Sequence, residues 1–332
     1  MKWGLLGCGD MAGKATATSI QRADGCGLVA VYGRCNEKAR AFARRFGIPR
    51  SYDDLDGFVR DPEIEAVFVS TPVSLHCEHT LACLRHEKHV LCEKPMALTV
   101  AECDRMIQES RRQGRALSVA YYRRGYPQSR WIKDCLESGA LGRLFWFHFQ
   151  YATWYDPQPG ARGSWRLSPE MSGGGVLPDI GSHRIDLALY LGGPVSAVKA
   201  LVDTFSRGWE VDDTASLLLQ FDRGAHGLVQ VSFCCTEKLD RLTVHCTEGH
   251  LIAEPFEGGR ITLIRKGETL THEVPALPRD ECQRPLVENF AQHIEHGVPL
   301  LGSMEDGRRT NSIMEGAYSQ VDKGSEHRPI AP

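Results

Sequence analysis

The sequence has no long hydrophobic run, and charge of neither sign dominates it. Its 332 residues contain 39 Lys and Arg against 42 Asp and Glu, a net charge of −3. This balance provides no basic surface for nucleic acid, and Arg-dense stretches such as Arg44-Arg45 are typical of solvated helix faces. No apolar stretch reaches about 18 residues, the length that a membrane-spanning helix needs. We therefore expect neither a nucleic-acid partner nor a membrane partner.

Marks of secretion, of disulfides and of a metal centre are also missing. Met1-Lys2-Trp3 leads directly into an apolar run, without a separate hydrophobic region and cleavage site, so no signal peptide is predicted. The twelve Cys form no C-x-x-C pair, and we expect them to be reduced and mostly buried. His76 and His79 have the spacing of a ligand pair, but no third ligand is evident, so no metal is predicted. These features indicate a cytoplasmic protein.

What the first part of the chain does contain is an alternation of short apolar runs and helical patterns. Apolar residues recur with helical spacing over 37–46, and Gly47 follows as a C-terminal cap. Thr99 and Glu102 have the spacing of a capping box, which opens a helix that runs to Gly114. Alternating strands and helices predict a doubly wound parallel sheet, so we assign residues 1–121 to a Rossmann dinucleotide-binding domain. The predicted strands are 3–6, 28–32, 66–70, 89–92 and 117–120.

The second part has a different rhythm, with many strands in succession. After a predicted helix at 127–138, apolar runs follow one another without intervening helices, which indicates one mainly antiparallel sheet. Two helical patterns, 281–296 and 303–321, close the chain. We assign residues 122–332 to an α+β domain for substrate binding and oligomerisation. Its predicted strands are 144–151, 195–202, 215–221, 227–233, 242–245, 261–264 and 269–274.

A glycine-rich motif follows the first predicted strand. Residues 7–12 read Gly-Cys-Gly-Asp-Met-Ala, the G-x-G-x-x-A pattern of dinucleotide-binding turns. Gly7 permits the tight turn, Gly9 lets the backbone approach a pyrophosphate, and the small Ala12 allows close helix packing. Asp10 and Met11 lie where the helix start offers its N–H groups to phosphate. We therefore expect all five residues at the cofactor.

The end of the second predicted strand bears on the choice of cofactor. An acid there would bind the ribose 2′-hydroxyl of NAD, but this chain has Gly33 followed by Arg34. The Arg34 guanidinium can bind a 2′-phosphate with forked hydrogen bonds, and Lys38 adds charge one turn later. NADP is therefore the predicted cofactor and NAD the alternative. In a simpler alternative interpretation, Arg34 stacks on adenine or faces solvent.

Three ordered motifs resemble those of the glucose–fructose oxidoreductase, inositol dehydrogenase and rhizopine catabolism (Gfo/Idh/MocA) family. They are V-S-T-P-V-S-L-H at 69–76, K-H-V-L-C-E-K-P-M at 88–96 and S-G-G-G-V-L-P-D-I-G-S-H-R-I-D at 172–186. The resemblance covers essentially the whole chain. It implies a Rossmann domain, a second domain with a large open sheet that forms dimer or tetramer contacts, and an active site between them. The family's usual triad maps onto Lys94, Asp179 and His183, and a cis peptide bond is implied before Pro95.

The same three residues suit alcohol oxidation on chemical grounds. His183 can take the hydroxyl proton, because an imidazole titrates near working pH. The Lys94 ammonium, just past the end of a predicted parallel strand, can stabilise a developing alkoxide. Asp179 can orient the imidazole or bind a neighbouring substrate hydroxyl. In simpler interpretations, Asp179 is a helix cap, His183 is structural and Lys94 is a surface lysine.

Further residues are expected along the cofactor and the substrate. We place Thr71, Pro72, His76, Glu93 and Tyr122 at the cofactor together with Lys94. The chain departs from the family at Val73 and at Tyr122, where many members have Asn, and Tyr122 can stack near the nicotinamide or close the pocket. Substrate contacts are expected from Lys94, Tyr122, Trp165, Arg166, Asp179 and His183.

These observations predict an oxidoreductase that transfers a hydride between NADP and a sugar, cyclitol or related diol. Two alternatives stay open: an enzyme that cleaves glycosides by transient oxidation with tightly held NAD, and a non-catalytic nucleotide-sensing regulator. The complete Lys94, Asp179 and His183 set argues against the regulator. The expected partners are a small carbohydrate or polyol and, through the second sheet, further copies of the chain as a homodimer or homotetramer.

Overall fold

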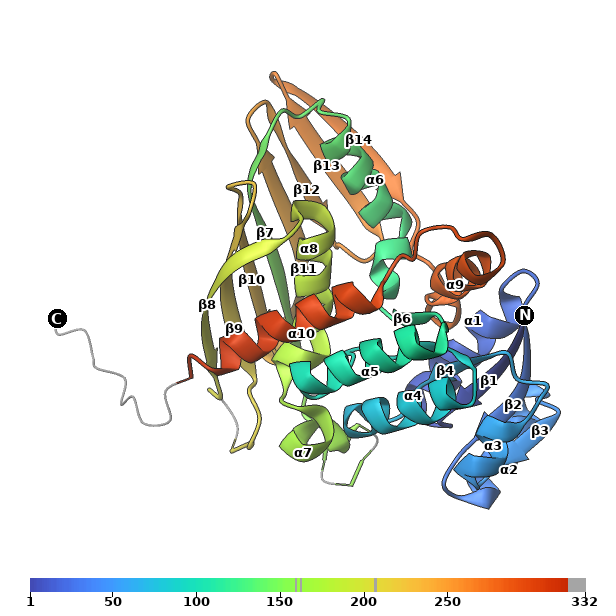
Figure 1. Cartoon of the computed structure of the whole chain (residues 1–332). Coiled ribbons are helices and arrows are strands. Elements are labelled where there is room, and N and C mark those ends of the chain that lie inside the picture. The colour runs from blue at the N-terminus through green and yellow to red at the C-terminus, as the bar shows by residue number, and fades with distance from the viewer. Residues whose placement is uncertain (159, 162, 206–207, 322–332) are drawn as a thin grey trace.

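Two β-sheets stand side by side in the computed structural model, which describes residues 1–158, 160, 161, 163–205 and 208–321. A six-stranded sheet belongs to the first part of the chain and an eight-stranded sheet to the second (Figure 1). In the described part of the chain, no helix is long and apolar enough to cross a membrane.

The first sheet is parallel throughout and has the strand order β3-β2-β1-β4-β5-β6. This doubly wound order reverses between β1 and β4, the place where such sheets bind ligands beyond the carboxyl ends of their strands. The predicted Rossmann sheet is thus confirmed, and the short β3 is the strand that the sequence pattern missed. The strands are β1 (Lys2–Leu6), β2 (Gly27–Tyr32), β3 (Arg50–Tyr52), β4 (Ala66–Val69), β5 (His89–Cys92) and β6 (Leu117–Val119).

The helices around this sheet follow the predicted signals. The apolar stripe of the second helix buries Ala39, Phe42 and Ala43, and Gly47 caps it with a positive φ of 64°. At the start of α5, Thr99 Oγ1 accepts from the Glu102 N–H, and the Glu102 side chain accepts from the Thr99 N–H. The helices are α1 (Ala17–Arg22), α2 (Asn36–Phe46), α3 (Leu55–Arg60), α4 (His76–Arg85) and α5 (Val100–Gln113).

The second sheet has the order β14-β13-β12-β11-β7-β10-β9-β8. Only the β7–β10 pair is parallel among its described pairings, so the predicted mainly antiparallel sheet is confirmed. The strand β12 was not predicted, and β11 is much longer than predicted. The strands are β7 (Leu144–Trp154), β8 (Val195–Asp203), β9 (Thr214–Phe221), β10 (His226–Ser232), β11 (Cys234–Cys246), β12 (Gly249–Glu254), β13 (Gly259–Arg265) and β14 (Glu268–Val274).

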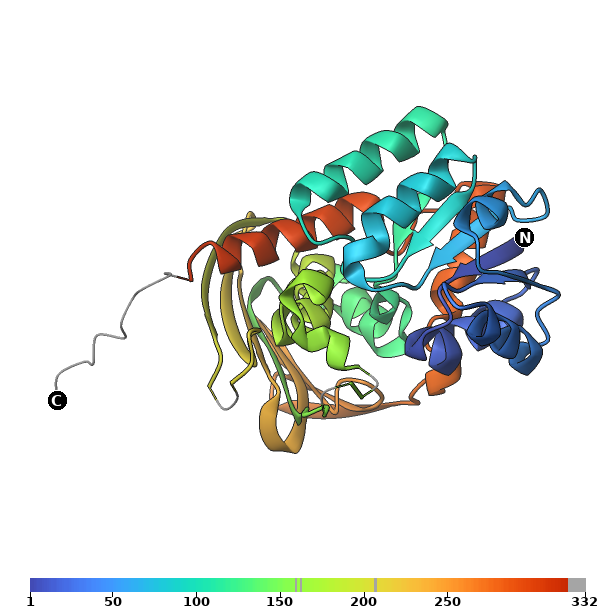
Figure 2. The same ribbon diagram turned by 90° about the horizontal axis from the view of Figure 1, so that it is seen from below.

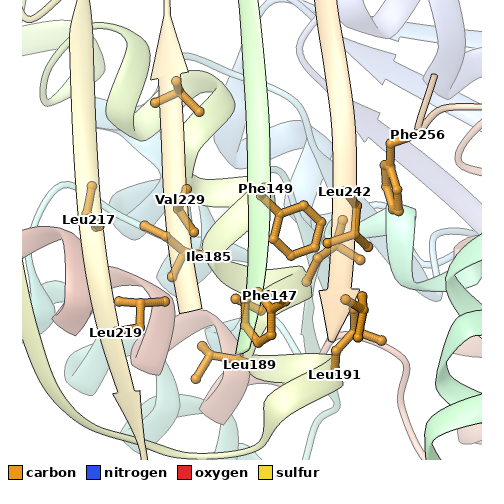
Figure 3. Packing of buried hydrophobic residues seen from close by; sticks show 14 of the residues in the cluster. Phe147, Phe149, Ile185, Leu189, Leu191, Leu217, Leu219, Val229, Leu242 and Phe256 are labelled. Carbon is orange, nitrogen blue, oxygen red and sulfur yellow. The ribbon is translucent and has the colours of Figure 1, made fainter. Parts of the chain in front are cut away.

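One face of this sheet packs against helices, and the alternation of its side chains follows from the pleat. Phe147 and Phe149 of β7 are fully buried against the helices. Trp146, the residue before Phe147, points to the other face and is 40% exposed. Figure 3 shows the two phenylalanines against residues of the helix α8 (Ser182–Gly192), such as Ile185 and Leu189. This packing fixes α8, which carries His183, on the inner face of the sheet.

The remaining helices join the two sheets. The helix α10 contacts α5, α8 and β8, and it lies between the eight-stranded sheet and α5 in two views (Figures 1 and 2). The helix α9 returns to the first sheet, where Phe290 packs on Trp3 with ring centroids 5.6 Å apart. The bounds are α6 (Pro127–Glu137), α7 (Pro169–Ser172), α9 (Arg284–His296) and α10 (Met304–Tyr318).

Candidate active site

A single cleft of about 1370 Å³ runs along the carboxyl edge of the first sheet and reaches α8. It brings together residues from both parts of the chain that the sequence motifs single out. The predicted site residues that line it are Gly7, Gly9, Asp10, Met11, Gly33, Arg34, Lys38, Thr71, Pro72, His76, Glu93, Lys94, Tyr122, Trp165, Arg166, Asp179 and His183.

The glycine-rich turn forms the floor of one end of the cleft. Gly7 has a φ of 117°, and a Cβ there would lie 2.4 Å from the Ser70 carbonyl oxygen, so only glycine fits. Gly9 has open space on the side where a Cβ would stand, which leaves its backbone accessible to a ligand. Ala12 is the one predicted cofactor residue that does not line the cleft. It is fully buried, so its small size serves helix packing alone.

Positive side chains gather where the cleft meets α2. Arg34 and Lys38, the two cations predicted at the cofactor, line the cleft, and Arg45 lines it as well. Arg45 was expected on a solvated helix face. Because Lys38, Phe42 and Arg45 are separated by three or four residues, they share one face of α2, and this periodicity could have identified Arg45.

His76 holds two cleft loops together. Its Nδ1 lies 2.8 Å from the Pro95 carbonyl oxygen and its Nε2 lies 2.9 Å from the Thr71 carbonyl oxygen. Burial lowers the pKa of His76 to about 4, so the neutral ring donates its one N–H to one of these two carbonyl oxygens. His76 fixes the Thr71 loop against the Lys94–Pro95 peptide bond, which is cis as the resemblance implies.

Lys94 and Asp179 meet in the middle of the cleft. Lys94 Nζ donates to Asp179 Oδ1 at 3.0 Å and to the Asp179 carbonyl oxygen at 2.6 Å. Arg166 Nε lies 3.2 Å from the other carboxylate oxygen, Oδ2. Burial disfavours charge on Asp179, but the two cations outweigh it and lower its pKa to about 2. Asp179 is thus an ionised carboxylate between a lysine and an arginine.

His183 lies deeper, beneath two tyrosine rings. It is 3% exposed, and its ring centroid is 5.1 Å from that of Tyr122 and 6.0 Å from that of Tyr121. Burial lowers its pKa well below 6.5, and the nearby Arg123 and Lys94 lower it further, so the imidazole is neutral.

Asp179 does not orient this imidazole. Among the described residues Nδ1 of His183 is buried and has no hydrogen-bond partner, and the Asp179 carboxylate bonds to Lys94 and Arg166 instead. Asp179 lies on a π-helical turn, Leu177–Gly181, that precedes α8. The wider turn removes the regular α-helical spacing on which a contact between residues 179 and 183 would depend.

The remaining predicted residues surround this centre. The Arg166 guanidinium lies 4.6 Å from the centroid of the Trp165 ring, so the two side chains form one wall. Glu93 is buried, burial raises its pKa, and its carboxylate accepts hydrogen bonds from Gln283 Nε2 and the Lys94 N–H. Glu93 therefore supports the backbone of Lys94 from below.

A buried ionic network next to His183 was not predicted. Arg123 Nε lies 2.6 Å from Glu257 Oε1, and Arg184 Nη2 lies 2.7 Å from Asp240 Oδ1 and 3.3 Å from the same Glu257 oxygen. Arg123 and Glu257 also line the cleft. No local sequence signal connects these residues, because Glu257 follows β12 and reaches the site only through the folded sheet.

Comparisons with known proteins agree with this architecture. Residues 1–121 match the model of an oxidoreductase family with an NAD-binding Rossmann fold, and residues 129–252 match the GFO/IDH/MocA C-terminal domain. Levoglucosan dehydrogenase of Pseudarthrobacter phenanthrenivorans is 32% identical over 87% of this chain and 86% of its own. The 1,5-anhydro-D-fructose reductase of Ensifer adhaerens is 32% identical over 92% of each chain.

Solved structures show the same likeness. A levoglucosan dehydrogenase in complex with NADH and levoglucosan superposes with a TM-score of 0.87 and 26% identity over 96% of each chain. The family matches cover the first sheet, the strands β7 to β11 of the second sheet and the motifs that carry Lys94, Asp179 and His183. The chain therefore belongs to the GFO/IDH/MocA family of oxidoreductases, whose first domain is an NAD-binding Rossmann fold.

Proposed function

We propose that this protein is an NADP-preferring oxidoreductase that transfers a hydride between the nicotinamide and a CH–OH group of a sugar, cyclitol or related diol. One observation carries the proposal. Lys94 Nζ, 3.0 Å from Asp179 Oδ1, shares a cleft with the imidazole of His183 and with the open backbone of Gly9. A proton-transfer group, a cation and a dinucleotide-binding turn thus line one cavity.

His183 is the proposed proton acceptor. A neutral imidazole has a free lone pair for the proton of a substrate hydroxyl, and burial keeps His183 neutral. In the direction of ketone reduction, His183 first takes up a proton and then donates it from the imidazolium form. The rings of Tyr121 and Tyr122 keep bulk water away from it, so the proton moves between substrate and imidazole.

Lys94 and Asp179 are proposed to hold the reacting carbon–oxygen bond. The Lys94 ammonium can stabilise the negative charge that grows on the substrate oxygen as its proton leaves. Asp179, ionised between Lys94 and Arg166, fixes the direction of the ammonium and can accept a hydrogen bond from a neighbouring substrate hydroxyl. This makes Asp179 a substrate-binding and positioning group and not the partner of His183.

The residues present fit a dinucleotide with a 2′-phosphate. The space beside Gly9 accommodates a pyrophosphate, and Arg34, Lys38 and Arg45 provide three cations at the end where the ribose would lie. When bound, the nicotinamide supplies the hydride chemistry. A charge-assisted hydrogen bond to phosphate contributes about 1.5–3 kcal/mol, which corresponds to roughly a 10- to 150-fold preference.

Two features support a carbohydrate-like substrate. The names of similar proteins refer to sugars, anhydrosugars and inositol. In this chain, Trp165 offers an aromatic face in the cleft beside the polar groups of Arg166 and Asp179. Aromatic faces pack on the C–H surface of a sugar ring while charged groups take its hydroxyls.

A spectrophotometric screen tests the proposed function. Sugars, sugar acids, inositols and aromatic diols are offered with NADP and with NAD, and formation of reduced cofactor is measured. We expect turnover with at least one polyol and a higher kcat/KM for NADP. Binding of either cofactor without turnover of any substrate, in either direction, would favour the nucleotide-sensing regulator. Cleavage of a glycoside without formation of reduced cofactor would favour the enzyme that cleaves glycosides by transient oxidation.

The preference for NADP has its own test in Arg34→Ala. We expect the Kd of NADPH to rise about 10- to 150-fold and that of NADH to change little, because only NADPH carries the 2′-phosphate. Calorimetric titration of both reduced cofactors measures the two values. Equal weakening of NADH and NADPH would assign Arg34 to adenine stacking and overturn the 2′-phosphate assignment.

We also propose that the outer face of the eight-stranded sheet binds a second copy of the chain. Trp146, Leu201 and Leu218 expose 40%, 71% and 51% of their surface on the face opposite the buried helices. Apolar side chains across several strands favour an interface. Light scattering of Leu218→Glu should show a smaller species than that of the wild-type protein, and an unchanged mass would contradict this interface.

A further inference from the structure

The loops that follow β1 and β2 press against each other beside the cleft. Leu6 lies opposite Tyr32 in the parallel β1–β2 pair, so both loops leave the same edge of the sheet. A Cβ added to Gly33 would lie only 2.5 Å from Cys8 Sγ. Favourable contacts between such atoms lie beyond about 3.5 Å, so a side chain at 33 and the thiol at 8 compete for the same space.

The clash arises from the sulfur atom alone. The same added Cβ would lie 3.7 Å from Cys8 Cβ and 3.5 Å from Ala39 Cβ, which are ordinary contact distances. The thiol is half-buried, and burial raises its pKa, so it stays neutral. The Gly33 N–H donates to the Tyr52 carbonyl at 3.0 Å, which holds the loop from its other side.

Position 33 has a particular meaning in a dinucleotide-binding sheet. The end of the second strand is where an Asp or Glu binds the ribose 2′-hydroxyl of NAD, and its charge would repel a 2′-phosphate. In this chain the thiol of Cys8 fills the place where such a side chain would begin. The next residue, Arg34, is exposed and lines the cleft with Lys38.

We propose that Cys8 determines which residues position 33 accepts, and through that position contributes to cofactor specificity, because its thiol occupies the space where an acid at 33 would begin. The x residue of the G-x-G turn would thereby select against NAD without touching the ribose. This inference rests on the proposed function only in that the cleft binds a nicotinamide dinucleotide. It predicts that residues 8 and 33 change the cofactor preference together and not independently.

The first test measures the Kd of NADH and NADPH for C8A, G33D and C8A/G33D. We expect C8A to leave the ratio of the NADH and NADPH Kd values near that of wild type, because position 33 still carries no acid, and G33D to bind both cofactors at least about tenfold more weakly. The double variant should bind NADH well and shift the preference toward NADH by about 10- to 150-fold. The matched control C8S/G33D keeps an atom at the γ position and should bind NADH as weakly as G33D.

A second test needs no cofactor and covers the case in which G33D fails to fold. Gly33→Ala places only a methyl group against the thiol, so it should lower the Tm of the wild-type chain by about 3 °C or more. In the C8A background, the same substitution should change the Tm by less than about 1 °C. Equal effects of Gly33→Ala in both backgrounds would overturn the steric coupling.

The proposal would also fall if G33D alone bound NADH as tightly as C8A/G33D, because the thiol would then be no barrier. Failure of the proposed NADP preference is a separate result. It would show as equal affinities of the wild-type protein for NADH and NADPH, whereas the coupling is read from the non-additivity of the two substitutions.

Discussion

At the scale of single residues, the site depends on the contrast between a buried neutral base and a charged centre. His183 lies beneath Tyr121 and Tyr122, where burial and the adjacent Arg123 keep its imidazole neutral. Asp179 keeps its charge in the same cleft because two cations contact it. Titratable groups whose pKa values are shifted strongly by burial and by neighbouring charges are typical of sites that transfer a proton.

The ring of Tyr122 should control the pKa of His183. Tyr122→Ala admits water beside the imidazole, which weakens the desolvation that lowers this pKa, so the pKa rises toward 6.5. Below its pKa the imidazole is protonated and cannot accept a proton. The acid limb of kcat/KM for alcohol oxidation should therefore move to higher pH, and the rate near pH 6 should fall relative to that at pH 8.

Tyr122→Phe is the matched control for this effect. It keeps the ring over His183 and removes only the hydroxyl that accepts from Arg123 Nη1 at 3.1 Å. Its pH profile should remain close to that of the wild-type protein. An acid limb at the same pH in the Ala, Phe and wild-type enzymes would remove His183 from the proposed proton transfer.

At the scale of elements, the sequence identified the features that depend only on residues close together in the chain. The spacing of Thr99 and Glu102 predicted the capping box of α5, and the stripe of Ala39, Phe42 and Ala43 predicted α2, because both depend on residues within one or two turns. The three-residue β3 was too short for a periodic pattern. The π-helical turn Leu177–Gly181 has no composition signal, and it changed the expected relation of Asp179 to His183.

The capping box allows a test of one element's contribution to stability. Thr99→Ala removes the hydroxyl that accepts from the Glu102 N–H at the start of α5. We expect the free energy of unfolding to fall by about 1 kcal/mol, as is usual for an N-cap, measured by urea denaturation. Thr99→Ser retains the hydroxyl and should retain most of the stability. An Ala variant as stable as the Ser variant would contradict the capping role.

At the scale of the whole molecule, the candidate centre exists only because two distant parts of the chain meet. The resemblance placed Lys94 and Asp179 in one triad, but only the fold shows that their charged atoms lie 3.0 Å apart. The contact of α9 with the first sheet, through Phe290 and Trp3, joins residues at opposite ends of the chain. Helical periodicity predicted α9, but a pattern within one helix does not specify which sheet it covers.

Buried neutral histidines should make the folded protein sensitive to acid. Burial lowers the pKa of His79 and of His89 to about 4, and His89 Nδ1 accepts a hydrogen bond from the Ala116 N–H. Below pH 6.5 the unfolded chain binds protons at these residues and the folded chain does not. Stability is therefore lost progressively as the pH falls from 6.5 to about 4.

Thermal unfolding against pH measures this loss. We expect the Tm to fall by about 5 °C or more between pH 7 and pH 4.5. His89→Gln cannot gain this proton, so its Tm should fall less steeply over the same range. Identical slopes for the variant and the wild-type protein would assign the acid sensitivity to other groups.

The proposed role of His183 as proton acceptor is tested most directly by the rate of hydride transfer in His183→Asn, measured in a single turnover with a polyol that the wild-type enzyme oxidises. The variant keeps a polar side chain of similar size, and cofactor binding is followed separately by fluorescence. We expect NADPH affinity near that of the wild-type protein and hydride transfer slower by about 10²- to 10⁴-fold. Hydride transfer at the wild-type rate, with cofactor bound, would contradict this role.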